Sequence, residues 1–170
     1  MKSSKESNVY NYIFIGFIIL ALSTSIFAFS KSIEQDKQFI KEYLIFRKSM
    51  AELSERNYEE AEKLIKYLLP RHEESYLIQW NYGLILKEQG RYLEAEERMR
   101  HAREIRPALV TEPKYLFDYG EGLYRLNEMT GAERYLEEYL KSKDATHITE
   151  AEKIIKEIKY KKEALVGNEG

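Results

Sequence analysis

The chain has two parts that differ in how apolar and polar residues are arranged. Residues 12–29 form a stretch of 18 residues without a charge. A helix of that length spans roughly 27 Å of a hydrocarbon core that is roughly 30 Å thick. Beyond Lys31, apolar residues recur at helical spacing among many charged residues. The pattern predicts one transmembrane helix over residues 12–30 and amphipathic helices after it.

The amphipathic part repeats one pattern of residues. Its clearest copy runs from Tyr76 to about Pro107 and predicts two helices that are joined by a turn at residues 90–92. The recurring positions are Tyr82, Gly83, Tyr92 and Ala95 in this copy, Tyr58 and Ala61 in the copy before it, and Tyr119, Gly120, Leu123, Ala132 and Leu136 in the copy after it. The upstream step is 34 residues, whereas the downstream step is 37 residues. We therefore expect an insertion near residues 108–113.

The clearest copy closely resembles the tetratricopeptide repeat, whose pattern places a large residue, Leu-Gly, Tyr, Ala, Phe and Pro at fixed spacing. The resemblance covers about residues 37–145 and implies an all-α fold, in which about three helical hairpins stack into a short right-handed α-solenoid. Several positions depart from the pattern. Among them, Ser49 stands where Gly is expected, Asn127 replaces the turn Gly, and Tyr139 replaces a small Ala. We expect Tyr139 to require local repacking at a tight helix crossing.

The segment after Asp144 predicts an end helix that caps the solenoid. Thr146 or Thr149 can act as its N-cap, and its apolar residues at helical spacing are Ile148, Ala151, Ile154, Ile155 and Ile158. Its other face consists of Lys and Glu, which suits a terminal helix that faces water. The predicted organisation is a short N-terminal tail (1–11), the transmembrane helix (12–30), the repeat domain with its capping helix (31–163) and a flexible tail (164–170).

The N-terminal apolar stretch has two interpretations. It exceeds the 7 to 15 apolar residues that are usual in a secretory signal, which favours an uncleaved anchor. However, Lys2 and Lys5 form a basic region before it, and residues 28–30 pass as a cleavage site. The polar residues within it are expected to bond to their own helix backbone: Ser23, Thr24 and Ser25.

The orientation in the membrane is not decided by charge, because lysines flank the apolar stretch on both sides. Long domains cross the membrane largely regardless of their charge. We therefore favour a repeat domain that is exported, into the periplasm if the source is a bacterium, while a cytoplasmic orientation stays open.

Composition and motifs argue against several classes of function. The chain is 33% charged, yet its net charge is -2, whereas nucleic-acid binding usually needs a basic stripe. Cysteine is absent and His72, His101 and His147 are far apart, so we expect no metal and no cofactor. Paired glutamates recur on each second helix, but adjacent residues point about 100° apart, which favours a solvated face over acid–base catalysis. Because no phosphate loop or nucleophile motif occurs, we expect neither an enzyme nor a small-molecule substrate.

In the family that the chain resembles, the first helix of each repeat lines a concave groove. The resemblance aligns Phe46, Trp80 and Phe117 at one position of these helices, which implies an aromatic stripe along the groove. The other candidate partner-binding residues are Leu77, Asn81, Leu84, Lys114 and Tyr124. Such a groove suits a partner helix or an extended peptide. Two alternatives stay open: the aromatics belong to the core, or the linker helix of residues 33–54 fills the groove.

Some members of this family bind the C-terminal carboxylate of a chaperone through a clamp of Lys, Asn and Arg side chains. The aligned residues here are Phe46, Met50, Asn81, Lys114 and Asp118. Only Asn81 and Lys114 match, and Asp118 would repel a carboxylate. The resemblance therefore does not extend to a receptor for chaperone tails.

These features predict a single-pass, membrane-anchored scaffold or assembly subunit of an envelope complex, which holds a protein partner beside the membrane. Confinement to the membrane would raise the effective concentration of even a weak contact. The alternative is an accessory or quality-control factor that hands exported clients to a chaperone or protease. Self-association through an uncapped end is also open, because so few repeats are present.

Overall fold

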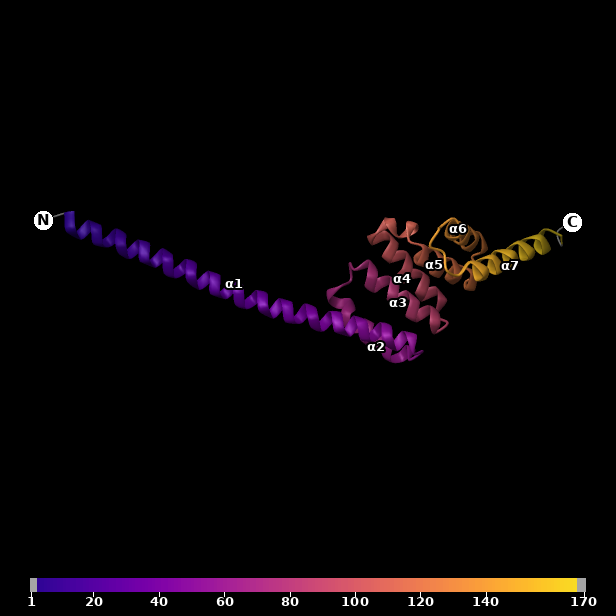
Figure 1. Ribbon diagram of the computed structural model, residues 1–170, viewed down its shortest axis with the longest axis horizontal. Helices are drawn as coiled ribbons and strands as arrows, with labels where there is room; N and C mark the ends of the chain where they lie inside the picture. The colour runs from indigo at the N-terminus through magenta and orange to yellow at the C-terminus, as the bar shows by residue number, and fades with distance from the viewer. Residues whose placement is uncertain (1–2, 168–170) are drawn as a thin grey trace. The chain divides into compact units, whose positions relative to one another are not determined.

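The computed structural model describes residues 3–167, with the side chains of residue 12 and of residues 14–164. In that part of the chain every regular element is an α-helix or a short 3-10 helix (Figure 1). The elements are α1 (Ser3–Ser54), α2 (Tyr58–Leu68), η1 (Leu69–Arg71), α3 (Tyr76–Glu88), α4 (Tyr92–Ile105), η2 (Pro107–Thr111), α5 (Pro113–Arg125), α6 (Met129–Leu140) and α7 (Ile148–Gly167). The predicted all-α class is confirmed.

The chain divides into two units, one up to Leu44 and one from Ile45 onward. The domain boundary that the sequence predicts after residue 30 stays a prediction. Helix α1 begins at Ser3, inside the segment that was predicted as a short tail over residues 1–11, of which residues 1 and 2 lie outside the described part.

The first unit contains one stretch that is long and apolar enough to cross a membrane by length and composition. It lies in α1, within residues Phe14–Ser54, has a mean hydropathy of 1.8, and none of it is buried. Its hydroxyl groups bond to the helix itself, as predicted. Ser23 and Thr24 donate to the carbonyl of Leu20 at 2.9 and 3.0 Å, and Ser25 donates to that of Ala21 at 2.8 Å. These bonds leave the polar groups of the stretch satisfied without a partner helix.

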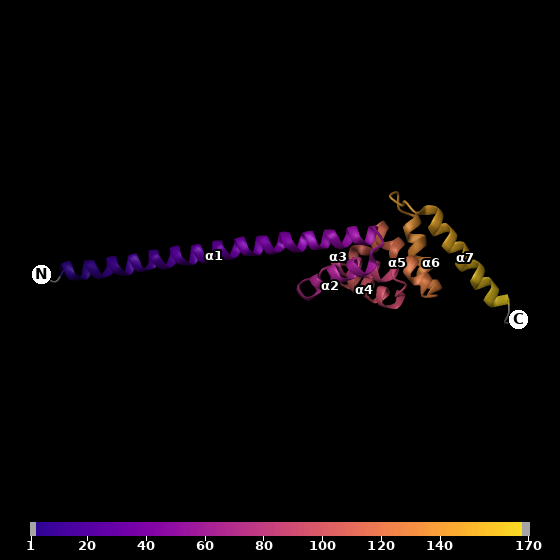
Figure 2. The same cartoon turned by 90° about the horizontal axis from the view of Figure 1, so that it is seen from below.

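The second unit consists of helical hairpins that pack in chain order. Helix α3 pairs with α4 and α5 with α6, while α2 packs on α3, α4 on α5, and α6 on α7 (Figure 2). The residues from Ile45 to the end of α1 stand before α2 as the first helix of the first hairpin. The predicted helix pairs and the helix after them are therefore present.

Glycine allows the two helices of a hairpin to approach closely. A Cβ atom on Gly83 would lie 2.7 Å from Met99 Cγ and 3.0 Å from the carbonyl oxygen of Ala95. A Cβ atom on Gly120 would lie 2.9 Å from Leu136 Cγ. Contacts this short do not occur between ordinary Cβ atoms and their neighbours, so both crossings depend on the missing side chain.

The first hairpin solves the same problem with Ser49, one of the residues that depart from the repeat pattern. Ser49 is fully buried, and its hydroxyl donates to the carbonyl of Ala61 at 2.8 Å. A small polar side chain is tolerated at the crossing because its hydrogen bond is satisfied there. The departure is therefore compatible with a complete first repeat.

The turns within the hairpins share one backbone conformation. Arg56, Gly90 and Asn127 have φ angles of 64°, 76° and 65°. In each turn the following residue donates to a carbonyl five positions earlier: Asn57 to Glu52 at 2.8 Å, Arg91 to Leu86 at 2.9 Å, and Glu128 to Leu123 at 2.9 Å. This is the hydrogen-bond pattern of the Schellman cap, which ends a helix with a left-handed residue. Asn127 thus takes the role of the expected turn glycine.

The predicted insertion forms the short helix η2. Its Leu109 side chain is fully buried, and the backbone N–H of Glu112 donates to the Leu109 carbonyl at 3.0 Å. Pro113 then begins α5 at a position where the absent N–H costs no hydrogen bond. The extra residues are therefore part of the packed structure.

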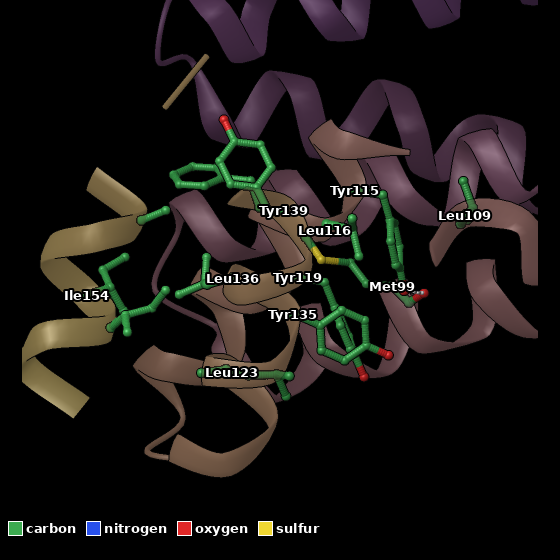
Figure 3. Packing of buried hydrophobic residues seen from close by; sticks show 14 of the residues in the cluster. Met99, Leu109, Tyr115, Leu116, Tyr119, Leu123, Tyr135, Leu136, Tyr139 and Ile154 are labelled. Carbon is green, nitrogen blue, oxygen red and sulfur yellow. Dashed lines mark hydrogen bonds between the residues drawn. The ribbon is translucent and has the colours of Figure 1, made fainter. Parts of the chain in front are cut away.

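Tyrosines dominate the larger of two core clusters (Figure 3). The rings of Tyr115 and Tyr119 stack at 5.5 Å between centroids, and Tyr135 meets Tyr119 edge-on at 4.8 Å. The buried hydroxyl of Tyr115 donates to the carbonyl of Met99 at 2.9 Å. Aromatic area and satisfied hydroxyls therefore hold α4, α5 and α6 together.

Tyr139 fits at the end of α6 because α7 follows there. The side chain is 1% exposed, and its ring lies 5.3 Å from that of Phe117. Its hydroxyl accepts a hydrogen bond from the backbone N–H of His147 at 2.6 Å. The large side chain thus fixes the segment that leads into α7.

The end helix α7 buries the predicted apolar face. Ala151, Ile154, Ile155 and Ile158 are buried, and Ile154 projects toward Leu136 of α6 (Figure 3). The predicted N-cap is wrong. Because α7 starts at Ile148, the N-cap position belongs to His147, whose carbonyl accepts from the Ala151 N–H at 3.0 Å. The helix continues to Gly167, inside the predicted tail, and residues 168–170 lie outside the described part.

Candidate partner-binding site

The candidate residues on α3 differ in their exposure. Leu77 is 39% exposed, Trp80 is half-buried, and Leu84 is buried in the core. Asn81 is also buried, and its amide donates to the Leu77 carbonyl of its own helix at 2.7 Å. Leu77 and Trp80 therefore offer the accessible surface on this helix, whereas Leu84 mainly supports it.

Phe46 and Tyr124 lie in different surroundings. Phe46 is half-buried against the smaller core cluster, which includes Ile65 and Ile85. The Tyr124 hydroxyl bonds to Glu157 of α7 at 2.5 Å, and Lys161 lies over its ring at 4.8 Å. The structure thus uses Tyr124 as a contact between α5 and α7.

Trp80 joins α3 to the beginning of α5. Its ring meets Tyr115 edge-on, with 5.6 Å between centroids, and the ammonium of the exposed Lys114 lies 6.0 Å from the centre of the Trp80 ring. The buried indole Nε1 has no hydrogen-bond acceptor with good geometry. The indole is therefore partly buried in the core and partly exposed. Its buried N–H makes no hydrogen bond of good geometry.

A buried ionic cluster lies next to Trp80. Lys87 Nζ is 2.6 Å from a Glu121 oxygen, 3.7 Å from Asp118 Oδ1 and 3.9 Å from a Glu88 oxygen. Burial alone would lower the pKa of Lys87, but the Asp118 and Glu121 carboxylates outweigh burial and raise it above its ordinary value. Lys87 is therefore charged, and its ammonium interacts with several carboxylates at once.

Asp118 is the least compensated member of this cluster. It is 8% exposed, and burial raises the pKa of its carboxyl, an effect that Lys87 and Lys114 only partly offset. Its Oδ2 has no hydrogen-bond donor. The indole of Trp80 lies close enough to lower the Asp118 pKa slightly, but not in good hydrogen-bond geometry. A buried carboxylate oxygen therefore lacks a partner in the free protein.

A cleft of about 430 Å³ opens beside Asp118. Helix α5 forms one wall, and the segment between α6 and α7 forms the other. His147 stacks on Phe117, with 4.7 Å between ring centroids. The lining residues are Pro113, Lys114, Phe117, Asp118, Tyr139, Asp144, Thr146 and His147. The cleft therefore combines an aromatic floor with charged groups at its sides.

The structure brings only some of the predicted residues together. Trp80, Lys114 and Phe117 meet around Asp118 and the cleft, while Phe46 and Tyr124 have separate surroundings. The sequence reasoning missed the cluster of Lys87, Asp118, Glu121 and the cleft residues Asp144 and His147. The signal for Asp118 was present, since it occupies the position of a clamp arginine, but it was read only as a missing clamp.

The cleft can be described by the chemical groups that line it. Within the residues whose side chains are described, no group of three His, Cys, Asp or Glu residues could hold a metal ion. What the cleft offers is an aromatic surface, the exposed cation of Lys114 and the poorly compensated carboxylate of Asp118. Such a set can bind a side chain and a stretch of backbone.

Stacked helical hairpins with close crossings and left-handed turns define a tetratricopeptide-repeat-like fold. Folds of this kind are typically protein-interaction modules rather than enzymes. No protein-family model matches the chain, and no curated protein matches it. The similarity to known proteins therefore comes from solved structures.

Three solved structures illustrate the similarity. The translocator chaperone SycD of Yersinia enterocolitica has a TM-score of 0.61 and 20% identity, over 71% of this chain and 85% of that chain. The Sgt2 TPR domain of Aspergillus fumigatus has a TM-score of 0.59 and 17% identity, over 76% and 83%. A T3SS complex from Aeromonas hydrophila has a TM-score of 0.61 and 16% identity, over 72% and 83%. At such identities the likeness shows the fold alone.

Proposed function

We propose that this chain is a membrane-anchored protein-interaction scaffold, which binds a helix or an extended peptide of a partner on the side of the first helices. The observation that carries the proposal is the cleft beside α5, because it joins an aromatic floor to charged and polar side chains. Leu77 and Trp80 extend the accessible apolar surface from α3. An apolar surface with a few placed polar groups is what recognition of a peptide requires.

The fold comparison supports a peptide as the partner. One of the similar structures is SycD of Yersinia enterocolitica in complex with a peptide of the translocator YopD, with a TM-score of 0.59 and 18% identity. That structure shows that a fold of this kind accommodates a peptide. For the present chain the contacts we propose are those of Leu77, Trp80 and Phe117, with Lys114 at the edge of this surface and Phe46, Asn81, Leu84 and Tyr124 supporting it.

The membrane part of the proposal rests on the N-terminal stretch. We propose that residues 12–30 anchor the chain and that the repeats are exported, as a subunit of an envelope complex. Mean hydropathy of 1.8 and the absence of burial in this stretch support an anchor. An anchor would confine the cleft to two dimensions, so a weak peptide contact would gain effective concentration.

A photo-crosslinking amino acid at position 77, in the membrane-embedded protein in its native cells, tests this function. Leu77 on α3 is exposed beside Trp80, so we expect capture of one dominant partner in stoichiometric amount. The matched control is position 93, since Leu93 is also exposed but lies on α4. Equal capture from both positions, or none from position 77, contradicts the proposal. Many substoichiometric partners at position 77 would instead identify a client-handling factor.

A further inference from the structure

Asp118 and Glu121 share one buried ammonium, that of Lys87. Among the side chains that the structure describes, Lys87 is the one ammonium within ion-pair distance of Asp118, and it makes its short contact, 2.6 Å, with Glu121. Glu121 also has Arg125 at 3.5 Å, whereas Asp118 keeps only the contact of 3.7 Å. The carboxylate that faces the cleft is therefore the one with the weakest compensation.

The charges of the cleft define what an occupant has to supply. Asp118 Oδ2 and Trp80 Nε1 are both buried and lie near each other without good hydrogen-bond geometry, so the Asp118 carboxylate is poorly compensated inside the folded chain. An anion would supply no donor and would meet the negative charges of Asp118 and of Asp144, which also lines the cleft. A basic side chain supplies the positive charge that the Asp118 carboxylate lacks.

In the structure the ammonium of Lys114 already lies near Trp80 and Asp118. Its ammonium lies over the Trp80 ring, its side chain is exposed, and its charge helps to lower the Asp118 pKa. A cation over an indole face is a favourable arrangement that a lysine or arginine of a partner can reproduce. Because Lys114 is on the surface, its side chain can move aside at little cost. The basic side chain of the peptide would then provide the positive charge in the cleft.

We propose that the cleft selects a peptide with an arginine or lysine side chain, which takes the place of Lys114 over Trp80 and bonds to Asp118. The hypothesis rests on the proposed function and specifies its partner. It is opposite in sign to a carboxylate clamp, since here the protein supplies the anion and the peptide supplies the cation. Phe117 and His147 would hold an apolar side chain next to the basic one.

A positional-scanning library of acetylated octapeptides tests this specificity on the full chain in lipid nanodiscs. Each position is occupied in turn by arginine, lysine, citrulline, glutamate or norleucine, and the retained peptides are counted by mass spectrometry. We expect arginine and lysine to be enriched at one position by about tenfold over citrulline, the neutral isostere of arginine. Retention of peptides without basic enrichment overturns the inference but leaves the proposed function intact, whereas retention of no peptide contradicts both.

Two substitutions with opposite expected effects test whether Asp118 causes the preference for basic peptides. Asp118→Asn removes the negative charge at nearly constant shape and should abolish the basic preference, whereas Lys114→Ala removes the competing cation and should increase it. Asp144→Asn is the matched control at the rim, with the same charge change, and should keep most of the preference. Each variant is first checked for an unchanged helical circular-dichroism spectrum. A basic preference that survives Asp118→Asn, or falls in Lys114→Ala, overturns the proposal.

The chain contains one tryptophan, so its indole N–H resonance provides an independent measurement of peptide binding. The indole N–H resonance of Trp80 should shift when the selected peptide is added, because the cation over its ring is exchanged and the neighbouring Asp118 carboxylate gains a partner. Binding that leaves this resonance unchanged would place the peptide elsewhere and overturn the assignment to this cleft.

Discussion

At the scale of single residues, the left-handed turn position shows how one backbone requirement is met by three different side chains. Glycine adopts a positive φ without strain, Asn does so at moderate cost, and other residues pay roughly 1–2 kcal/mol. Gly90, Asn127 and Arg56 all occupy this conformation. The first hairpin is therefore closed by the least suitable of the three residues.

Replacing Arg56 with glycine should stabilise the protein by about 1 kcal/mol, because the strain of the positive φ is removed. The exposed Arg56 side chain contributes little to the packed structure. The measurement is urea unfolding of the full chain in detergent, followed by circular dichroism. Gly90→Ala, the reverse change at the equivalent position, should destabilise by a similar amount. If both variants unfold like the parent chain, the turn conformation does not matter for stability.

The close helix crossings make a second prediction, in which one substitution has opposite effects at two glycines. Gly83→Ala should lower stability by about 1–3 kcal/mol, because its Cβ would meet Met99 Cγ at 2.7 Å and the Ala95 carbonyl at 3.0 Å. Gly122→Ala should raise stability by about 0.5–1 kcal/mol, since nothing lies within 4 Å of its Cβ and alanine favours the helix. Unfolding of both variants by urea decides the point, and effects of equal sign would contradict the close approach at Gly83.

The sequence predicts a residue's role when that role depends only on its place in the repeat pattern. The crossing at Gly83 and the left-handed position at Asn127 follow from the repeat pattern, since a hairpin needs them at fixed places. Asp118 could not be interpreted in the same way, because its compensation depends on Lys87, which lies on another helix. The role of Tyr139 likewise depends on His147, in a segment without repeat pattern.

At the scale of helices, a polar contact reinforces the junction of the first and second hairpins. Glu62 of α2 bonds to Lys66 of its own helix at 2.6 Å and to two residues at the turn after α3, Gln89 and Arg91, both at 2.9 Å. Burial would raise the pKa of Glu62, but these hydrogen bonds outweigh it and lower the pKa from 4.5 to about 2. The carboxylate therefore favours the folded state while it is ionised.

This junction predicts how stability depends on pH. Because the folded pKa of Glu62 lies below its ordinary value, its contribution is fully present above pH 4.5 and is lost as the pH falls toward about 2. Glu62→Gln should cost about 1–2 kcal/mol at pH 7 and should flatten the loss of stability between these pH values. Unfolding by urea at a series of pH values measures both effects.

The control for this prediction is Glu59→Gln on the same helix, since the Glu59 side chain is exposed. It should leave both the stability at pH 7 and the slope below pH 4.5 nearly unchanged. A Glu62 variant that loses stability with acid as steeply as the parent chain would remove Glu62 from the list of groups that respond to pH.

The helices themselves were largely predictable, and the connections were less so. Amphipathic spacing predicts the hairpins because each must bury one face on its neighbour, and the 37-residue step reveals extra residues near Ala108. Periodicity does not reveal that these residues form η2 with Leu109 in the core. It also placed the N-cap of α7 on a threonine, because cap preference was considered without the contact between Tyr139 and His147.

At the scale of the whole molecule, α7 ends the repeat array with a face that is suited to water. Its apolar residues point into the core, while Lys153, Lys156 and Tyr160 are exposed. Repeat arrays grow or associate by stacking apolar faces, so a polar last helix gives a further copy little to bind. Stacking of a second copy on this face of α7 is therefore disfavoured.

The last prediction concerns the anchor and separates it from a cleaved signal. Membranes are extracted with alkaline carbonate, and the intact mass of the protein is then measured. We expect the chain to stay in the membrane with a mass that includes residues 12–30, because that apolar stretch is long enough to span the hydrocarbon core. Leu20→Arg places a charge in its middle at a cost of about 3 kcal/mol and should reduce insertion, whereas Leu93→Arg, on the exposed surface of α4, should not. A soluble product that lacks residues 12–30 would show that the stretch is a signal, and the repeats would then meet their partner without a tether.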